Sequence, residues 1–141
     1  MKKIIFAVVL GVVAVVMLGV PVLAAAQRLP LEQRCGNTSG GGSVVLYDSK
    51  APNSVEMELI LRGALPNQGY DVICRTWLPD YSNYSETTVG TVYTNKGGAA
   101  IGSYTLSVAT PGDYVFSLEL RKAEAGHLLQ YDAGPVTLSF D

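Results

Sequence analysis

Apolar and polar residues alternate one by one in several short stretches of this chain. Residues 55–62 carry Val, Met, Leu and Leu at every second position, and residues 114–121 carry Tyr, Phe, Leu and Leu in the same way. Alternation with a period of two is the pattern of a strand that buries one face and exposes the other. No segment shows sustained helical periodicity, so the pattern favours a domain made of strands and turns.

Turn-forming residues separate these stretches at regular intervals. Residues 65–69, 95–98 and 110–113 combine Pro, Gly, Asn and Asp, which favour turns. Between and around them we expect strands at 44–47, 55–62, 70–75, 86–94, 100–108, 114–121, 127–131 and 136–140. Short strands at such spacing are typical of a sandwich. We therefore predict that residues 44–141 form an all-β domain, an antiparallel two-sheet sandwich of about seven to eight strands.

The residues ahead of this predicted domain have a different composition. Residues 27–43 are mostly polar and end in the run Ser-Gly-Gly-Gly-Ser. Glycine and serine runs behave as flexible linkers. We therefore expect residues 27–43 to form a polar, flexible lead-in.

The first 26 residues have the composition of a targeting segment. Lys2 and Lys3 precede a long apolar run, which ends in Pro21 and a group of small residues. This order is typical of a secretory signal peptide. We predict cleavage between Ala26 and Gln27, which makes the mature protein secreted or extracytoplasmic. The alternative is an uncleaved N-terminal anchor, because the run is long enough to cross a bilayer. No comparable run follows, so we expect no membrane span in the mature chain.

The charge balance argues against nucleic acid as a partner. The full chain has 10 basic and 12 acidic residues, and Lys2 and Lys3 are lost with the signal peptide. The mature domain is therefore mildly acidic, without the basic cluster that neutralises phosphates. The chain also lacks a phosphate-binding glycine loop and an Asp-x-Asp pattern for calcium. We expect no nucleic acid, no cofactor and no metal.

Cys35 and Cys74 are the two cysteines of the chain. Disulfides persist in an oxidising compartment, and this bridge would close a loop of about 40 residues, worth about 4 kcal/mol in the chain-entropy model. A metal-binding or nucleophilic role is the alternative, but two cysteines without a nearby histidine make a weak zinc set. We predict a structural Cys35–Cys74 disulfide that attaches the lead-in to the sheet.

Residues 110–116 resemble the tyrosine corner of immunoglobulin-like domains, with Tyr114 following a Thr-Pro-Gly-Asp turn. In those domains the tyrosine hydroxyl bonds to the backbone upstream. Residues 65–72, where Leu65 and Pro66 precede Tyr70, are similar to a corner of fibronectin type III domains. Antibody-type domains carry a core cysteine where this chain has Phe116. The resemblance implies an immunoglobulin-like sandwich in which Tyr114 is a structural corner.

The residues needed for catalysis are scarce. His127 is the only histidine, and we interpret it as a surface or strand-end residue. Nucleophilic catalysis needs Ser or Cys with a base and an orienting group, and the chain has no Gly-x-Ser-x-Gly motif. Glu56 and Glu58 share one strand face, which indicates a solvated face rather than a glycosidase pair. We expect no catalytic residues, and a small secreted hydrolase is the remaining enzymatic alternative.

The segment 77–84 holds the residues that we single out for ligand binding: Trp77, Tyr81 and Tyr84. If Tyr70 and Cys74 face the core, strand parity places Trp77 on the outer face. Exposed aromatic rings with polar edges suit a sugar ring or a protein partner. The alternative is a bulge or a strand end that turns Trp77 back over the core.

These observations together predict a secreted, non-enzymatic binding or structural module at the cell exterior. Its expected partner is an extracellular or envelope protein or a glycan. The alternative function is a carbohydrate-binding module that uses Trp77, Tyr81 and Tyr84.

Overall fold

The structure is a computed structural model that describes residues 26–34, 40–123 and 129–141. Every regular element in these ranges is a strand, which confirms the all-β prediction. In chain order the elements are β1 (Gln27–Gln33), β2 (Gly41–Asp48), β3 (Ser54–Arg62), β4 (Gly69–Trp77), β5 (Ser85–Tyr93), β6 (Ala100–Ser107), β7 (Gly112–Lys122) and β8 (Leu129–Phe140).

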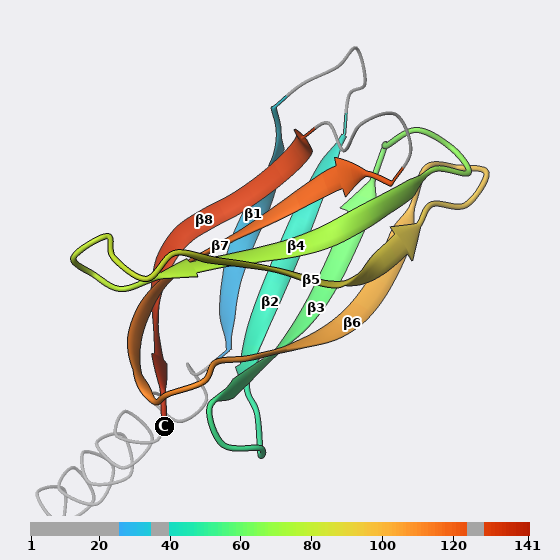
Figure 1. Cartoon of the computed structure of the whole chain (residues 1–141). Coiled ribbons are helices and arrows are strands. Elements are labelled where there is room, and N and C mark those ends of the chain that lie inside the picture. Colours follow the sequence, from blue (N-terminus) through green and yellow to red (C-terminus); the bar gives the residue numbers. More distant parts are fainter. Residues whose placement is uncertain (1–25, 35–39, 124–128) are drawn as a thin grey trace, which may run out of the picture.

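The strands form one antiparallel sheet in the order β5-β4-β7-β8-β1-β2-β3-β6. Figure 1 shows this sheet curled around on itself, so that it forms a nearly closed barrel. β1 joins its two halves, because residues 27–31 pair with β2 while Glu32 and Gln33 pair with β8. The structure therefore has one continuous sheet in place of the two separate sheets of the predicted sandwich, because β1 connects the two groups of strands.

The barrel interior is filled by alternate residues of the strands. On β3, Leu59 and Leu61 have no exposed surface, whereas Glu56 and Arg62 are exposed. Burying a leucine fully contributes roughly 1.5–3 kcal/mol. A slip of one residue would exchange the two faces, so this burial also determines the strand register. The largest fully buried side chains are Tyr70, Tyr131, Phe116, Leu46, Met57, Leu59, Leu61, Leu118 and Leu120.

The stretch 27–43 differs from the flexible lead-in that its composition predicted, because residues 27–33 and 41–43 belong to the sheet. Leu29 and Leu31 are buried at alternate positions of β1, so two apolar residues in a polar stretch line the core. Gly42 is part of β2, and a Cβ there would lie 1.8 Å from the carbonyl oxygen of Ile60. The glycine therefore permits a close approach of two strands and does not form a linker.

The last two expected strands form one strand, β8. It pairs with β7 along most of its length and with β1 near Asp132. The register shifts between Phe116 and Leu118 on β7, which is where β8 passes Gly134 and Pro135. Residues 124–128, and with them His127, lie outside the described residues.

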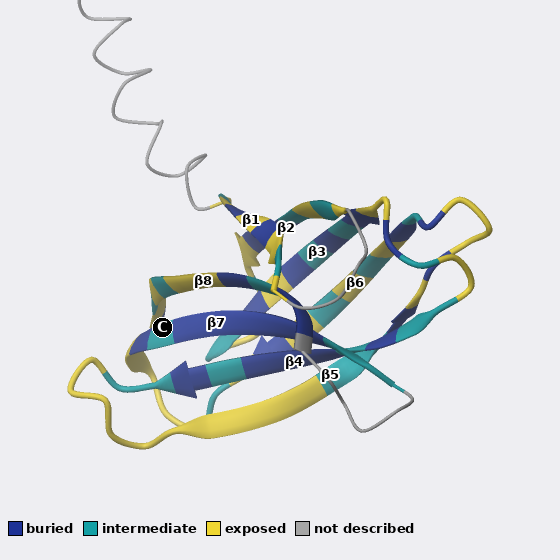
Figure 2. Ribbon diagram, turned by 90° about the horizontal axis from the view of Figure 1, so that it is seen from above, coloured by how far each residue is buried: buried dark blue, intermediate teal, exposed yellow. Residues whose placement is uncertain are grey.

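The edge strands β5 and β6 do not pair with each other in the described sheet. A tight turn joins them, in which the side-chain oxygen of Asn95 accepts hydrogen bonds from the amides of Gly97 and Ala99. From this turn the two strands diverge (Figure 1). Near the turn the Tyr104 ring covers the gap, and a Cβ at Gly90 would lie 2.6 Å from that ring. Figure 2 shows that the first half of β5, farther from the turn, is exposed.

Candidate functional site

The β4–β5 hairpin carries all three residues that the sequence singled out for ligand binding. Trp77 ends β4, Tyr81 lies in the connecting loop, and Tyr84 immediately precedes β5. Figure 1 shows this hairpin projecting beyond the rest of the barrel. Tyr81 is 82% exposed and Tyr84 is 54% exposed, whereas Trp77 is half-buried. The fold therefore brings the three aromatic residues to one end of the molecule.

Trp77 lies on the outer face of the barrel. β4 keeps a regular register with β7 as far as Trp77, which pairs with Val115, so no bulge returns the indole to the core. The Trp77 and Tyr84 ring centroids are 6.4 Å apart, and their planes are tilted by 31°. The Arg75 guanidinium lies 5.9 Å from the Trp77 ring and 5.4 Å from the Tyr84 ring, within cation–π range. The indole Nε1 is buried and has no hydrogen-bond partner among the described residues.

The hairpin loop is held by its own hydrogen bonds. The Leu78 amide donates to the Ser82 carbonyl at 2.8 Å, and the Tyr81 amide donates to the Leu78 carbonyl at 2.8 Å. Asp80 accepts from the Ser82 hydroxyl and amide, and these bonds lower the pKa of Asp80. Tyr81 has a φ of 65°, a left-handed conformation that is uncommon for a tyrosine. The loop therefore holds the backbone of the exposed Tyr81 in place.

An ion-pair network links the outer faces of β4, β5 and β7 beside the hairpin. Glu119, with its side chain only 7% exposed, contacts Arg75 and lies 2.6 Å from Nη2 of Arg121. Arg121 also makes two hydrogen bonds to Glu86, at 2.9 and 3.0 Å. The Tyr84 hydroxyl accepts from Arg75 at 3.0 Å and donates to Glu86 at 2.7 Å. The network thus determines how the Tyr84 ring is oriented.

The same contacts stabilise the charged forms. Hydrogen bonds from Arg121 and Tyr84 lower the pKa of Glu86, and the bond to Glu86 is the main cause that raises the pKa of Arg121. Burial opposes the charge of Arg75, but Glu119 and Tyr84 outweigh it and raise its pKa. These three groups remain charged near neutral pH, so they orient side chains and do not exchange protons there.

Sequence patterns did not single out these network residues. The available signal was alternation, which places three polar residues on the outer faces of their strands: Arg75, Glu119 and Arg121. The missing information was the strand order, because β4 is the neighbour of both β5 and β7.

Cys74 carries a free thiol in the core, so the predicted Cys35–Cys74 disulfide is not seen. Cys74 is 1% exposed, and its Sγ lies 3.7 Å from the Sδ of Met57. The parity that turns Val72 into the barrel turns Cys74 inward with it. Burial raises the pKa of Cys74 to about 12, which disfavours the thiolate needed for metal binding or nucleophilic attack. Cys35 lies outside the described residues.

Tyr114 lies at the turn into β7. Its hydroxyl donates to the Thr110 carbonyl at 3.0 Å and lies 2.9 Å from the Thr110 hydroxyl. Its ring contacts Phe140 edge-on at 5.5 Å. A tyrosine bonded to the backbone four residues upstream has the form of a tyrosine corner.

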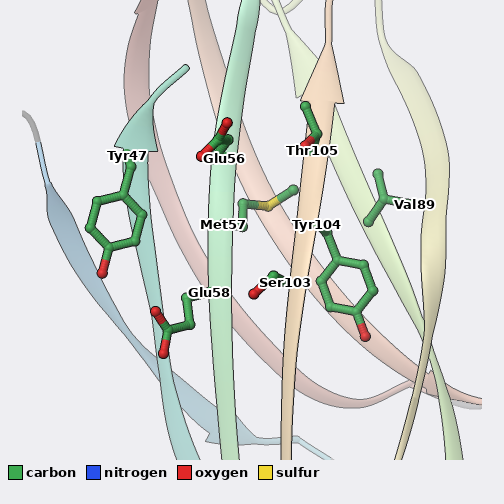
Figure 3. Close-up of a pocket in the computed structure, with 8 residues that line it drawn as sticks. All are labelled: Tyr47, Glu56, Met57, Glu58, Val89, Ser103, Tyr104 and Thr105. Carbon is green, nitrogen blue, oxygen red and sulfur yellow. The ribbon is translucent and has the colours of Figure 1, made fainter. Parts of the chain in front are cut away.

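A pocket of about 380 Å³ lies beside the gap between β5 and β6 (Figure 3). Its lining residues are Tyr47, Glu56, Met57, Glu58, Val89, Ser103, Tyr104 and Thr105. Its two carboxylates both come from β3, and no histidine or cysteine is among the lining residues. Within the described ranges, no three His, Cys, Asp or Glu residues are grouped closely enough to hold a metal ion.

No family model, no curated protein and no solved structure matches this chain. Among the residues that the structure describes, no helix is long and apolar enough to cross a membrane. Among the described residues, the most developed candidate site is the aromatic surface of the β4–β5 hairpin, formed by Trp77, Tyr81 and Tyr84.

Proposed function

We propose that this protein is a secreted, non-enzymatic binding module that recognises an extracellular or envelope protein through its β4–β5 hairpin. The observation that carries the proposal is the exposure of Tyr81 and Tyr84 on a loop held by its own hydrogen bonds. Rigid tyrosines provide large contact areas at a low entropic cost, and a preorganised loop lowers that cost further. Arg75 adds a cationic group beside the rings of Trp77 and Tyr84.

The position of β1 supports secretion followed by cleavage. β1 begins at Gln27, directly after the predicted cleavage site at Ala26. A cut there removes residues 1–26 and leaves every described strand intact. An uncleaved segment would instead tether the barrel to the membrane. The mass of the exported protein separates the two forms.

An immunoglobulin-like relationship is also part of the proposal. β4, β7 and β8 are neighbours in the order that strands C, F and G have in immunoglobulin domains, and β2, β3 and β6 follow the order of A, B and E. Tyr114 lies near the start of β7, in the F position, where a tyrosine corner is expected. The additional feature of this chain is β1, which joins the two groups of strands.

The experiment is a pull-down of envelope and extracellular fractions with the mature domain, using wild type and the double variant Tyr81→Ser, Tyr84→Ser. We expect the double variant to lose a protein that wild type captures. Tyr93→Ser is the matched control, because Tyr93 is 72% exposed but lies at the other end of β5. Equal capture by the double variant and wild type would contradict the proposal.

A glycan is the alternative partner, favoured by the neighbouring rings of Trp77 and Tyr84, whose centroids lie 6.4 Å apart. Trp77 is the only tryptophan, so its fluorescence reports on this surface alone. If the partner is a glycan, soluble oligosaccharides should shift the emission of Trp77 and protect it from an added quencher. Unchanged emission across a glycan panel would eliminate this alternative.

A further inference from the structure

β5 and β6 leave an open cleft at the end of the barrel that is farthest from their connecting turn. The cleft has a volume of about 420 Å³. Its lining comes from β4, β5, β6 and β7 and includes Thr76, Ser85, Thr87, Leu106, Val108 and Tyr114. No Asp, Glu, Lys, Arg or His is among the lining residues.

This cleft gives access to the interior of the barrel. Ser85 and Thr87 pair with Thr76 and Cys74, and paired residues of antiparallel strands point to the same face. Thr76 and Cys74 are buried in the barrel, so Ser85 and Thr87 also point inward, yet both are exposed. The inward face of β5 is therefore uncovered at this end, and buried Leu106 lies across the cleft from it.

The backbone along the cleft offers unused hydrogen-bonding groups. The Val108 amide donates to the Asn53 carbonyl on the β3 side at 2.8 Å. Since amides alternate between the two edges of a strand, those of Thr105 and Ser107 point away from β3 toward the gap. β3 is the only strand that pairs with β6 in the described sheet. The free edge of β6 thus presents a row of donors and acceptors.

This free edge lacks the usual protection against strand pairing. Edge strands are commonly protected by charged residues, by proline or by bulges. β6 contains no charged residue and no proline, and its pairing with β3 has no register shift. The Tyr104 ring covers the gap only near Gly90, where the two strands are still close.

We infer that the cleft binds an extended, uncharged segment of a partner protein, which adds as a strand to the free edge of β6. Alternate side chains of the segment fill the space between Thr87 and Leu106, and its backbone pairs with Thr105 and Ser107. The uncharged lining identifies the chemistry of the segment, because a charged side chain would lose its hydration here without gaining an ionic partner. This site is separate from the surface formed by Trp77, Tyr81 and Tyr84.

The test selects random nine-residue peptides displayed on phage against the mature domain and measures synthetic copies of the enriched sequences by fluorescence polarisation. We expect the enriched peptides to lack charged residues and to alternate apolar with polar positions. Thr105→Pro removes one free amide of β6 without touching the pairing to β3, and edge strands tolerate proline at such positions. We expect it to weaken binding by at least about tenfold.

A second variant covers the case in which Thr105→Pro does not fold. Thr87→Trp fills the cleft from β5 and should weaken the same peptides by at least about tenfold. Tyr81→Ser is the control, and it should leave the affinity within about twofold of wild type. Methylating alternate amides of the peptide should abolish binding if backbone pairing holds it.

The inference would be overturned by peptides that bind wild type and Thr87→Trp equally, by enriched peptides that are all charged, or by no enrichment above an unrelated control domain. Loss of binding in Tyr81→Ser alone would place the peptides on the β4–β5 hairpin. That result overturns the cleft site but agrees with the proposed function, so the two proposals fail separately. Dimerisation of the mature domain that no enriched peptide displaces would assign the cleft to a second copy and also overturn the inference.

Discussion

Glu119 is an acidic side chain that is almost entirely shielded from water by the two arginines that contact it. Burying a carboxylate costs several kcal/mol unless opposite charges and hydrogen bonds offset the lost hydration. Arg75 supplies both from the neighbouring strand β4, and Arg121 supplies both from β7 itself, two residues farther along the chain. The more exposed Glu86 loses less hydration, so the network should depend more strongly on Glu119 than on Glu86.

Removing the charge of Glu119 should therefore destabilise the barrel. We expect Glu119→Gln to lower the free energy of unfolding by about 3 kcal/mol, and Glu86→Gln to lower it by at most about 1 kcal/mol. Urea denaturation at pH 7 measures both. Glu56→Gln, at an exposed position of β3, is the control and should change the value by less than about 0.5 kcal/mol. Equal effects of the first two variants would contradict this ranking.

Cys74 should be protected from thiol reagents by its burial. In a Cys35→Ser variant we expect no labelling of the native protein at pH 8 and complete labelling in denaturant, both measured by mass spectrometry. Rapid labelling of the native protein would show that this part of the core opens readily. Two thiols in the unreduced, denatured wild type would agree with the free Cys74, whereas none would restore the predicted disulfide.

The same burial gives a pH dependence with a definite sign. The pKa of a cysteine in an unfolded chain is about 8.5, whereas burial raises the pKa of Cys74 to about 12. As the pH rises above the pKa of the unfolded thiol, the unfolded state loses the thiol proton while the folded state keeps it. The stabilising contribution is therefore complete below the unfolded pKa and is lost as the pH rises toward about 12. The free energy of unfolding should therefore fall less steeply between pH 8 and 10 in Cys74→Ala than in wild type. Urea denaturation at several pH values in this range measures the two slopes.

Two elements, β5 and β6, determine where the barrel is open. Their turn holds them together at one end, and Tyr104 covers the gap above Gly90. Beyond Val89, which packs against the core, the inward face of β5 carries only the small side chains of Thr87 and Ser85. Gly90 on β5 leaves room for the Tyr104 ring on β6, so these two residues together close the gap near the turn.

This pairing predicts an energetic coupling. Gly90→Ala should cost about 1–3 kcal/mol of unfolding free energy, because its methyl group meets the Tyr104 ring. In a Tyr104→Leu background the same substitution should cost at least about 0.5 kcal/mol less. A double-mutant cycle in urea measures the difference. Strict additivity would show that the ring does not close the gap in solution.

At the scale of the whole molecule, β1 makes two groups of strands into one sheet. It pairs with β2 over its first five residues and with β8 over its last two. Its inward residues, Leu29 and Leu31, are part of the core. Losing this strand would expose two new sheet edges and part of the core together.

Deleting residues 27–33 should therefore abolish cooperative unfolding, whereas deleting residues 1–26 should preserve it. Thermal unfolding followed by circular dichroism measures both variants. The physical reason is that the short form keeps every described strand, while the longer deletion removes the strand that connects β8 to β2. A cooperative transition after loss of 27–33 would show that the remaining strands form a stable sandwich without β1.

The sequence predicted seven of the strands within a few residues, and it missed β1. The successes rest on long alternating stretches such as β3 and β7, where the direction of each side chain is visible in the local pattern. The alternating pattern in β1 consists of only two apolar residues, Leu29 and Leu31. The glycines that follow have the composition of a linker, and only the structure shows that Gly42 packs against the backbone of Ile60. The expected pair of strands at the C-terminal end proved to be one, because β7 and β1 continue the pairing across the intervening residues.

Local alternation by itself determined that this protein is all-β and which faces of its strands are apolar, since side-chain direction on a strand depends only on parity. For Trp77, parity left open a bulge that would return the ring to the core, and the regular register of β4 with β7 decided against that bulge. Only the tertiary structure decided the strand order, the network around Glu119 and the cleft between β5 and β6. Each depends on strands distant in sequence, as with Arg75 and Glu119, which lie 44 residues apart in the chain. Side-chain direction is a local property, whereas neighbourhood between strands depends on how the whole chain closes the barrel.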